Sequence, residues 1–146
     1  MIKNTFNLKI YYVTIIYSAI IDKGMIIMFN YDIENLIESL NKRNMNGYFV
    51  KDRAELIEFL SILVDENTST GSGDSLSLCQ LDVFNFLREN TIFNDKFKEN
   101  LSIEEKRKIA LNNFNVDVFF SSCNAISQDG ELVFIDASGK RVAPII

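Results

Sequence analysis

The chain has 146 residues, of which 47% are hydrophobic and 24% charged, a composition typical of a globular domain and not of a disordered or collagen-like chain. Its 15 basic and 20 acidic residues give a net charge of −5, which argues against nucleic-acid binding because positive charge supplies most of that affinity. The absence of histidine excludes His-based triads and the commonest metal ligand. The two cysteines are too few for an iron–sulfur cluster or a four-thiolate zinc site, so we expect no metal on this chain.

An apolar run without charge covers residues 10–21, which is too short for a membrane span of about 20 residues. Three interpretations remain open. Its Tyr, Val, Ile and Thr residues favour a buried strand, and Lys3 and Lys9 ahead of it are typical of a secretory signal. The third, which we prefer, is that residues 1–27 are a translated leader outside the native start and that the domain covers residues 28–146.

From Asp32 onward the sequence predicts alternating helices and strands. Apolar residues spaced as on one helix face predict a helix that begins at Asp32 and ends at Gly47. A short β-branched and aromatic strand at 48–50 follows. A pattern like a capping box then predicts a second helix over residues 52–63, before a short strand at 67–70.

Beyond a glycine-rich segment, the apolar spacing over residues 78–87 predicts a third helix. The polar residues 88–101 are typical of a surface connection. Ser102 and Glu105 form a capping box that predicts a further helix, reaching about Leu111.

The last part of the chain is predicted to be extended. Residues 116–120 form the best-defined strand, and residues 131–136 and 141–146 predict a hairpin that turns at Ser138-Gly139 and carries an Asp136–Arg141 salt bridge. Helices alternating with strands predict an α/β fold with a mostly parallel sheet, flanking helices and a β-hairpin. Because the chain stops on an apolar run, we expect the fold to be incomplete at the C-terminus.

The glycine-rich segment is the first candidate site. Gly71 and Gly73 allow a sharp turn and close approach to a ligand, and the hydroxyls of Ser75 and Ser77 beside free N–H groups of a helix start would hold phosphate or carboxylate. The charge of Asp74 opposes an anion there. The alternative, favoured by the segment alone, is that these residues turn the chain and that Asp74 or Ser75 caps the helix.

The second candidate site follows the strand at 116–120. Ser122 and Asn124 lie at its carboxyl end, where open parallel sheets bind ligands, and Asn124 could orient a carbonyl or hydroxyl. Asp129 and Glu131 are candidate catalytic acids or bases if burial moves a pKa towards neutrality. The alternative for Asp129 is that it forms a tight turn with the glycine that follows it.

The cysteines are expected to play structural roles. Cys79 is predicted to be a small buried residue on its helix. Cys123 lies near a strand end, but no histidine is present to activate it as a nucleophile.

The sequence resembles the lactate utilisation protein family, also called the LUD domain, from about Met28 to Ile146. Its strongest part is residues 116–143 (VDVFFSSCNAISQDGELVFIDASGKRVA), which is similar to the family pattern ADVF…(T/S)xxNAI(T/S)xDGxLVxxDxxGNRVA. The segment 40–51 (LNKRNMNGYFVK) resembles the family's opening. The glycine-rich segment is similar to the family's Gly-x-Gly-Gly-Ser-x-Thr. It matches at Gly71, Gly73, Ser75 and Ser77, with Asp74 in place of a glycine, and further on Lys140 replaces an asparagine.

The resemblance implies a Rossmann-like fold related to ribose-5-phosphate isomerase and the CoA transferases, with the site at the carboxyl ends of the strands. It implies a cytoplasmic role in oxidising lactate to pyruvate, as a subunit or accessory beside iron–sulfur oxidoreductase subunits. The cluster would sit on the partner, and this chain would bind a small anionic metabolite. We expect no nucleic-acid partner and no membrane association. The alternatives are a stand-alone enzyme or binding protein for a phosphorylated sugar or acyl-CoA, and a non-functional remnant.

Overall fold

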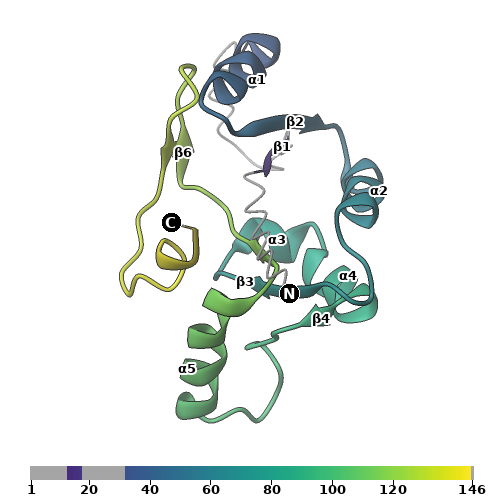
Figure 1. Ribbon diagram of the computed structural model, residues 1–146, viewed down its shortest axis with the longest axis vertical. Helices are drawn as coiled ribbons and strands as arrows, with labels where there is room; N and C mark the ends of the chain where they lie inside the picture. The colour runs from purple at the N-terminus through teal and green to yellow at the C-terminus, as the bar shows by residue number, and fades with distance from the viewer. Residues whose placement is uncertain (1–12, 18–31, 146) are drawn as a thin grey trace, which may run out of the picture.

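The computed structural model describes residues 13–17 and 32–145 (Figure 1). Helices and strands alternate along most of this part of the chain, as predicted. In chain order the elements are β1 (Val13–Tyr17), α1 (Ile33–Lys42), β2 (Asn46–Val50), α2 (Arg53–Leu63), β3 (Ser69–Ser72), α3 (Leu76–Gln80), α4 (Val83–Asn90), β4 (Ile92–Phe93), α5 (Ile103–Asn112), the 3-10 helix η1 (Asn113–Asn115), β5 (Val118–Phe120), β6 (Ala125–Ile126), β7 (Leu132–Val133) and the 3-10 helix η2 (Ala143–Ile145).

The strands form three separate ladders. In the central one, β3 pairs in parallel with β4 on one side and β5 on the other. β1 and β2 form a parallel pair, and β6 and β7 form an antiparallel hairpin. The α/β class and the parallel pairing are therefore confirmed.

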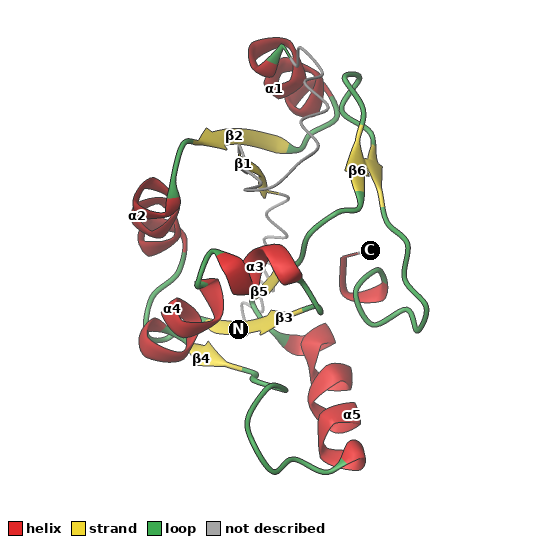
Figure 2. Ribbon diagram, turned by 180° about the vertical axis from the view of Figure 1, so that it is seen from behind, coloured by secondary structure: helices red, strands yellow, loops and turns green. Residues whose placement is uncertain are grey.

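The central ladder has helices on both faces (Figure 2). The side chain of Thr70 in β3 contacts that of Thr91 at the end of α4, with 2.7 Å between their hydroxyl oxygens. The neighbouring Gly71 faces Asn113, which follows α5. Because successive strand residues point to opposite faces, α4 and α5 cover opposite sides of β3.

The core lies between α2, α4 and the strands. Its buried members include Leu56 and Leu60 of α2 and Val83 and Leu87 of α4. Each pair is four residues apart, which places both side chains on one face of its helix. The predicted apolar face of α1 is likewise buried at Leu36 and Leu40.

The predicted helix starts are confirmed. The side chains of Asp32 and Asp52 accept hydrogen bonds from the backbone N–H groups of Asn35 and Glu55. At α5, both hydrogen bonds of the predicted capping box are present: the Ser102 side chain accepts the backbone N–H of Glu105, and the Glu105 side chain accepts the backbone N–H of Ser102. These interactions span only three residues, so the sequence is enough to identify them.

The end of α1 and the third helix differ from the predictions. The first helix ends at Lys42 and not at Gly47, which lies inside β2. The predicted single helix over residues 78–87 is two helices, because Asp82 has a φ of +60° between α3 and α4. A left-handed residue at this point changes the chain direction and interrupts the helical hydrogen bonds.

The interpretation of residues 88–101 as a surface connection is wrong for residues 88–96, of which the first three belong to α4. The edge strand β4 lies there, and Asp95 and Lys96 after it are buried. The polar composition hides this strand because the buried charges are paired with other charged side chains.

The C-terminal hairpin is also displaced from its predicted position. The ladder joins β6 to β7, with its turn at Asp129-Gly130, where the backbone N–H of Gly130 donates to the carbonyl oxygen of Ser127. The alternative interpretation of Asp129 as a turn residue is therefore confirmed. No ion pair joins Asp136 and Arg141 in the described residues, and the residues described beyond them form η2 and no strand.

For the N-terminal apolar run, the described residues Val13–Tyr17 form β1 and pair with β2, in line with the strand interpretation. The rest of residues 1–27, on which the signal and leader interpretations depend, lies outside the described residues. No helix in the described part of the chain has the length and apolar character to cross a membrane.

Candidate functional site

The glycine-rich segment is half strand and half loop. Gly71 and Ser72 belong to β3, and only the next three residues connect it to α3. A side chain at Gly71 would place its Cβ 2.4 Å from Oδ1 of the buried Asn113, so this glycine is required for packing. The hydroxyl of Ser72, which is 1% exposed, has no hydrogen-bond partner among the described residues.

Gly73 is the glycine that faces the second candidate cluster. Its backbone N–H donates to the carbonyl oxygen of Phe120 at 2.9 Å, which holds the ends of β3 and β5 together. A Cβ on Gly73 would lie 2.7 Å from Cγ of Arg141 and 3.1 Å from the hydroxyl oxygen of Ser121. The lack of a side chain at Gly73 therefore lets the stem of Arg141 lie across the strand ends.

Arg141 connects this glycine to Asn124. Its Nη2 group donates to the carbonyl oxygen of Ile135 and lies 3.4 Å from Oδ1 of Asn124. Its Nε and Nη1 groups donate to no atom in the described chain, and no carboxylate there lies within ion-pair distance. The donors on Nε and Nη1 point to different sides of the guanidinium, so each can give a carboxylate one charge-assisted hydrogen bond.

Asp136 holds the turn that carries Arg141. Its carboxylate accepts the backbone N–H of Arg141 at 2.6 Å and that of Val142 at 3.1 Å. These hydrogen bonds, the one from Arg141 first, hold the pKa of Asp136 below its ordinary value of 3.8. The group therefore remains ionised at neutral pH and positions the backbone of Arg141.

Asn124 is fixed at one end of its side chain and free at the other. Its Oδ1 atom accepts the backbone N–H of Ile135 at 2.8 Å, while its Nδ2 atom has no acceptor among the described residues. The neighbouring Ser121 and Ser122 are half-buried, and the hydroxyl of Ser121 donates to the carbonyl oxygen of Ser122. Arg141, Asn124 and Ser121 thus form a polar edge beside Gly73, which we call the Arg141 cluster.

The two serines of the glycine-rich segment do not join this cluster. Ser75 is the N-cap of α3, where its Oγ accepts the backbone N–H of Leu78 at 3.2 Å, and Ser77 lies exposed on the same helix. The capping alternative is therefore confirmed for Ser75. The carboxylate of Asp74 lies 3.0 Å from the ammonium of the buried Lys96, which neutralises the charge that would oppose an anion.

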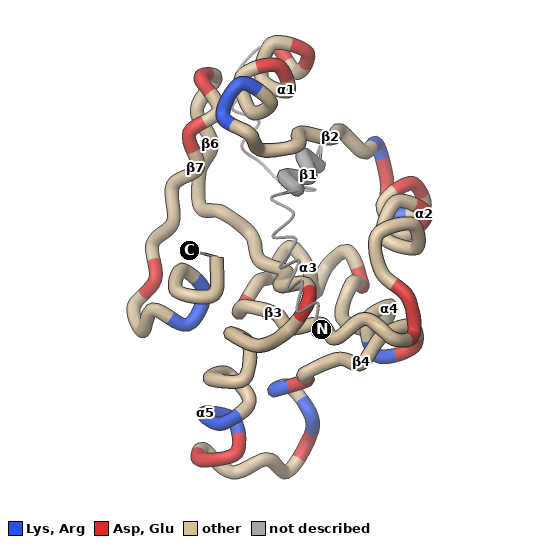
Figure 3. Tube along the Cα trace, in the orientation of Figure 1, with Lys and Arg blue, Asp and Glu red and all other residues tan. Residues whose placement is uncertain are grey.

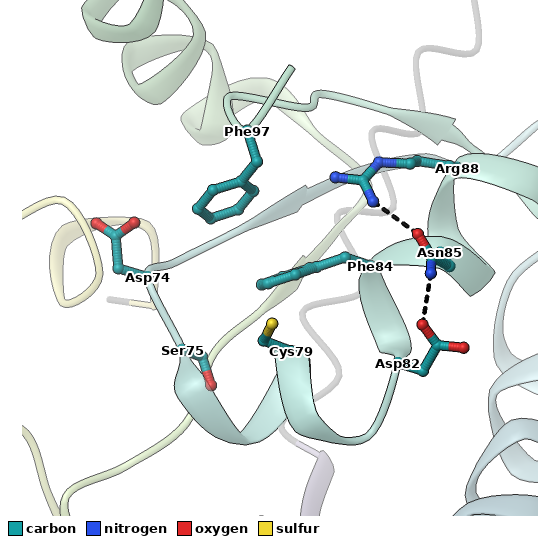
Figure 4. Close-up of a pocket in the computed structure, with 8 residues that line it drawn as sticks. All are labelled: Asp74, Ser75, Cys79, Asp82, Phe84, Asn85, Arg88 and Phe97. Atoms are coloured by element: carbon teal, nitrogen blue, oxygen red, sulfur yellow. Dashed lines mark hydrogen bonds between the residues drawn. The ribbon is translucent and has the colours of Figure 1, made fainter. Parts of the chain in front are cut away.

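Ser75 also lines a cavity that does not include Asn124 (Figure 4). The two candidate sites therefore do not share this cavity, although the resemblance places the site at the carboxyl ends of the strands. In the structure, Arg141 links Asn124 to the glycine-rich segment through Gly73.

Asp129 and Glu131 lie at the tip of the β6–β7 hairpin, next to the end of α1 (Figure 1). The Nε atom of Arg43 donates to the carbonyl oxygen of Asp129 at 2.8 Å, and its Nη2 atom lies 3.4 Å from the carboxylate of Glu131. Their contacts are with Arg43 and not with the Arg141 cluster, so a catalytic role for either acid stays a prediction.

The cysteines do not form a metal site. Cys79 is exposed and lines the cavity, so the expectation that it is buried is wrong, and burial raises the pKa of the Cys123 thiol. The described residues contain no group of three or more metal-ligating side chains.

Arg141 is the residue that sequence reasoning missed as a ligand candidate. It was interpreted as the partner of Asp136, since opposite charges on the two arms of a predicted hairpin favour a cross-strand pair. Basic and acidic residues are interspersed along the chain (Figure 3), so composition alone does not single it out. The sequence feature that points to Arg141 is its position near the end of the family motif at residues 116–143, which also contains Asn124.

A comparison with protein families matches residues 33–146 to the LUD domain. No curated protein and no solved structure matches the chain. The matched span covers well over half of the 146 residues and includes the glycine-rich segment, Asn124 and Arg141. The chain therefore belongs to the LUD domain family, the family of lactate utilisation proteins.

Proposed function

We propose that this protein binds the carboxylate of lactate or pyruvate at the Arg141 cluster and acts as a subunit or accessory of an iron–sulfur oxidoreductase system that converts lactate to pyruvate. The observation that carries the binding step is Arg141 at the carboxyl ends of β3 and β5, because its Nε and Nη1 donors have no acceptor among the described residues. The Nδ2 group of Asn124, which has no acceptor in the described part of the chain, is available for the 2-hydroxyl or 2-oxo oxygen of such an acid.

The second part of the proposal places the redox chemistry on a partner. Oxidation of lactate releases electrons, and iron–sulfur clusters are usually held by four cysteines, whereas this chain has two. A cytoplasmic partner that carries the cluster would accept these electrons. The proposal also includes a Rossmann-like arrangement related to ribose-5-phosphate isomerase and the CoA transferases, supported by the parallel β4-β3-β5 ladder with helices on both faces.

Binding is tested by the thermal shift that pyruvate or lactate produces in the full chain. We expect a concentration-dependent rise in the melting temperature, and Arg141→Gln should weaken binding roughly ten- to hundred-fold, as for loss of a hydrogen bond to a charged group. Gly73→Ala should also weaken binding, because the added Cβ displaces the stem of Arg141 while its charge remains.

The matched control is Arg107→Gln, which removes a cation from the exposed surface of α5. It should leave the pyruvate response unchanged. An equal loss in both arginine variants would show a general charge effect and would reject the Arg141 cluster as the binding site.

The partner is tested separately by affinity purification from the native cell and by deletion of the gene. Recovery of an iron–sulfur protein and loss of growth on lactate support the proposal. Purification of the chain alone, with unchanged growth on lactate after deletion, would reject the accessory role while leaving the binding result intact.

A further inference from the structure

A cavity of about 370 Å³ lies between α3, α4 and the segment that follows β4 (Figure 4). This volume lies within the roughly 300–1,000 Å³ of typical small-molecule sites. Neither Arg141 nor Asn124 lines it, so it is separate from the Arg141 cluster. The residues that carry the inference are Asp74, Ser75, Cys79, Phe84, Arg88 and Phe97.

One wall of the cavity is aromatic. The ring of Phe84 contacts that of Phe97, with 4.7 Å between centroids and 32° between planes, and the thiol of Cys79 lies next to them (Figure 4). Phe97 remains 38% exposed although its ring is large and apolar. Phe84 is buried, and the ammonium of Lys96 lies over the ring of Phe97, 5.2 Å from its centroid. A planar ring packed against the exposed part of Phe97 would bury apolar surface that now faces solvent.

The charged groups around the cavity are already neutralised in pairs. An added anion or cation would have to compete with an existing partner, whereas a neutral ligand would not. The pairs are Arg88–Asp95 at 2.8 Å, Asp74–Lys96 at 3.0 Å and Asp82–Arg53 at 2.5 Å.

Hydrogen-bonding capacity nevertheless remains at the rim. Arg88 uses Nε for Asp95 and Nη1 for Asn85, which leaves its Nη2 group without an acceptor in the described chain. Ser75 accepts one hydrogen bond on its Oγ, and its own hydroxyl hydrogen has no acceptor among the described residues. These donors suit the ring nitrogens or carbonyl oxygens of a heterocycle.

We propose that this cavity binds a neutral planar heteroaromatic group of nucleobase size, packed against the exposed part of Phe97 with an acceptor edge towards Arg88. The proposal does not depend on carboxylate binding at Arg141. It assigns the protein a second ligand site, on the α3–α4 side of the glycine-rich segment.

Cys79 provides a direct readout because it lies in the wall of the cavity. In the full-length Cys123→Ser variant, Cys79 is the sole thiol, and its alkylation by iodoacetamide can be followed by mass spectrometry. Adenosine at about ten times its Kd should slow alkylation about ten-fold, in proportion to the sites left free. Ribose, which lacks the purine ring of adenosine, should leave the alkylation rate unchanged.

The aromatic wall is tested in the same background. Phe97→Ala should raise the Kd for adenosine about ten-fold, as for loss of one stacking side chain, and Phe97→Tyr should restore binding. The control is Phe114→Ala on η1, which removes a ring that is 56% exposed away from the cavity. Circular dichroism melts establish that each variant is folded.

Three outcomes would overturn the proposal. They are unchanged alkylation at saturating adenosine concentrations, equal protection by ribose, and an equal change in Kd for Phe97→Ala and Phe114→Ala. Each is independent of the response to pyruvate, so failure here is distinguishable from failure of the proposed function.

Discussion

The β6–β7 hairpin is docked on α1 through a glycine whose replacement should be unusually destabilising. Gly130 has a φ of +76°, and a Cβ there would lie 2.9 Å from the backbone nitrogen of Leu40 and 2.9 Å from the carbonyl carbon of Ser39. Real side chains do not approach backbone atoms this closely, and a helix backbone cannot yield as the end of a flexible side chain can. Gly130→Ala should therefore force the hairpin away from α1.

Replacement of Gly139 serves as the control that measures the cost of a positive φ without a steric clash. Gly139 has a similar φ of +71°, but nothing lies within 4 Å of its Cβ position. Gly139→Ala should lower the free energy of unfolding by about 1–2 kcal/mol for the left-handed conformation alone. Gly130→Ala should lose a further 1–3 kcal/mol, roughly the loss seen on overpacking, giving about 2–5 kcal/mol in total.

The assay is urea unfolding of both variants and the wild type, followed by far-UV circular dichroism, with the free energies compared by linear extrapolation. Gly130→Ala should unfold at a clearly lower urea midpoint than Gly139→Ala, with a similar m-value. Equal losses would mean that only backbone conformation matters, and would refute the docking of the hairpin on α1.

Two further predictions concern buried and hydrogen-bonded carboxylates. Asp95, whose side chain is 2% exposed, accepts Nε of Arg88 and the backbone N–H of Phe97, each at 2.8 Å. Asp95→Ala should therefore lower the free energy of unfolding by about 2–4 kcal/mol, and Asp95→Asn by less, in the same urea assay. Hydrogen bonds from Ser69 hold the pKa of Asp117 below its ordinary value of 3.8. The ionised carboxylate therefore stabilises the fold above pH 3.8, and this contribution is lost as the pH falls through the lower pKa of the folded state. The stability difference between wild type and Asp117→Asn should shrink between about pH 6 and about pH 2, and a difference independent of pH would contradict this assignment.

The elements that the sequence identified correctly depend on short-range interactions. The caps at Asp32, Asp52 and Ser102 bond to groups three residues away, and the face of α1 that contains Leu36 and Leu40 follows from helical spacing. The family motif is likewise a continuous stretch of sequence. Local patterns of this kind need no knowledge of which segments meet in space.

The candidate site was only partly predictable, because its residues acquire their roles from distant neighbours. Gly71 and Gly73 look equivalent in the sequence, yet one packs against Asn113 and the other against Arg141. Asp74 was expected to oppose an anion, but Lys96 neutralises it. Each of these contacts joins different elements of the fold, and no spacing rule predicts them.

Taken by itself, the sequence determined the α/β class, the helix starts and the family, because spacing, capping and motif are properties of neighbouring residues. Only the tertiary structure decided that β4 pairs with β3, that the β6–β7 hairpin packs on α1 and that Arg141 lies across the strand ends. Strand pairing and side-chain contacts depend on which distant segments come together, and that choice is made by the packing of the whole chain.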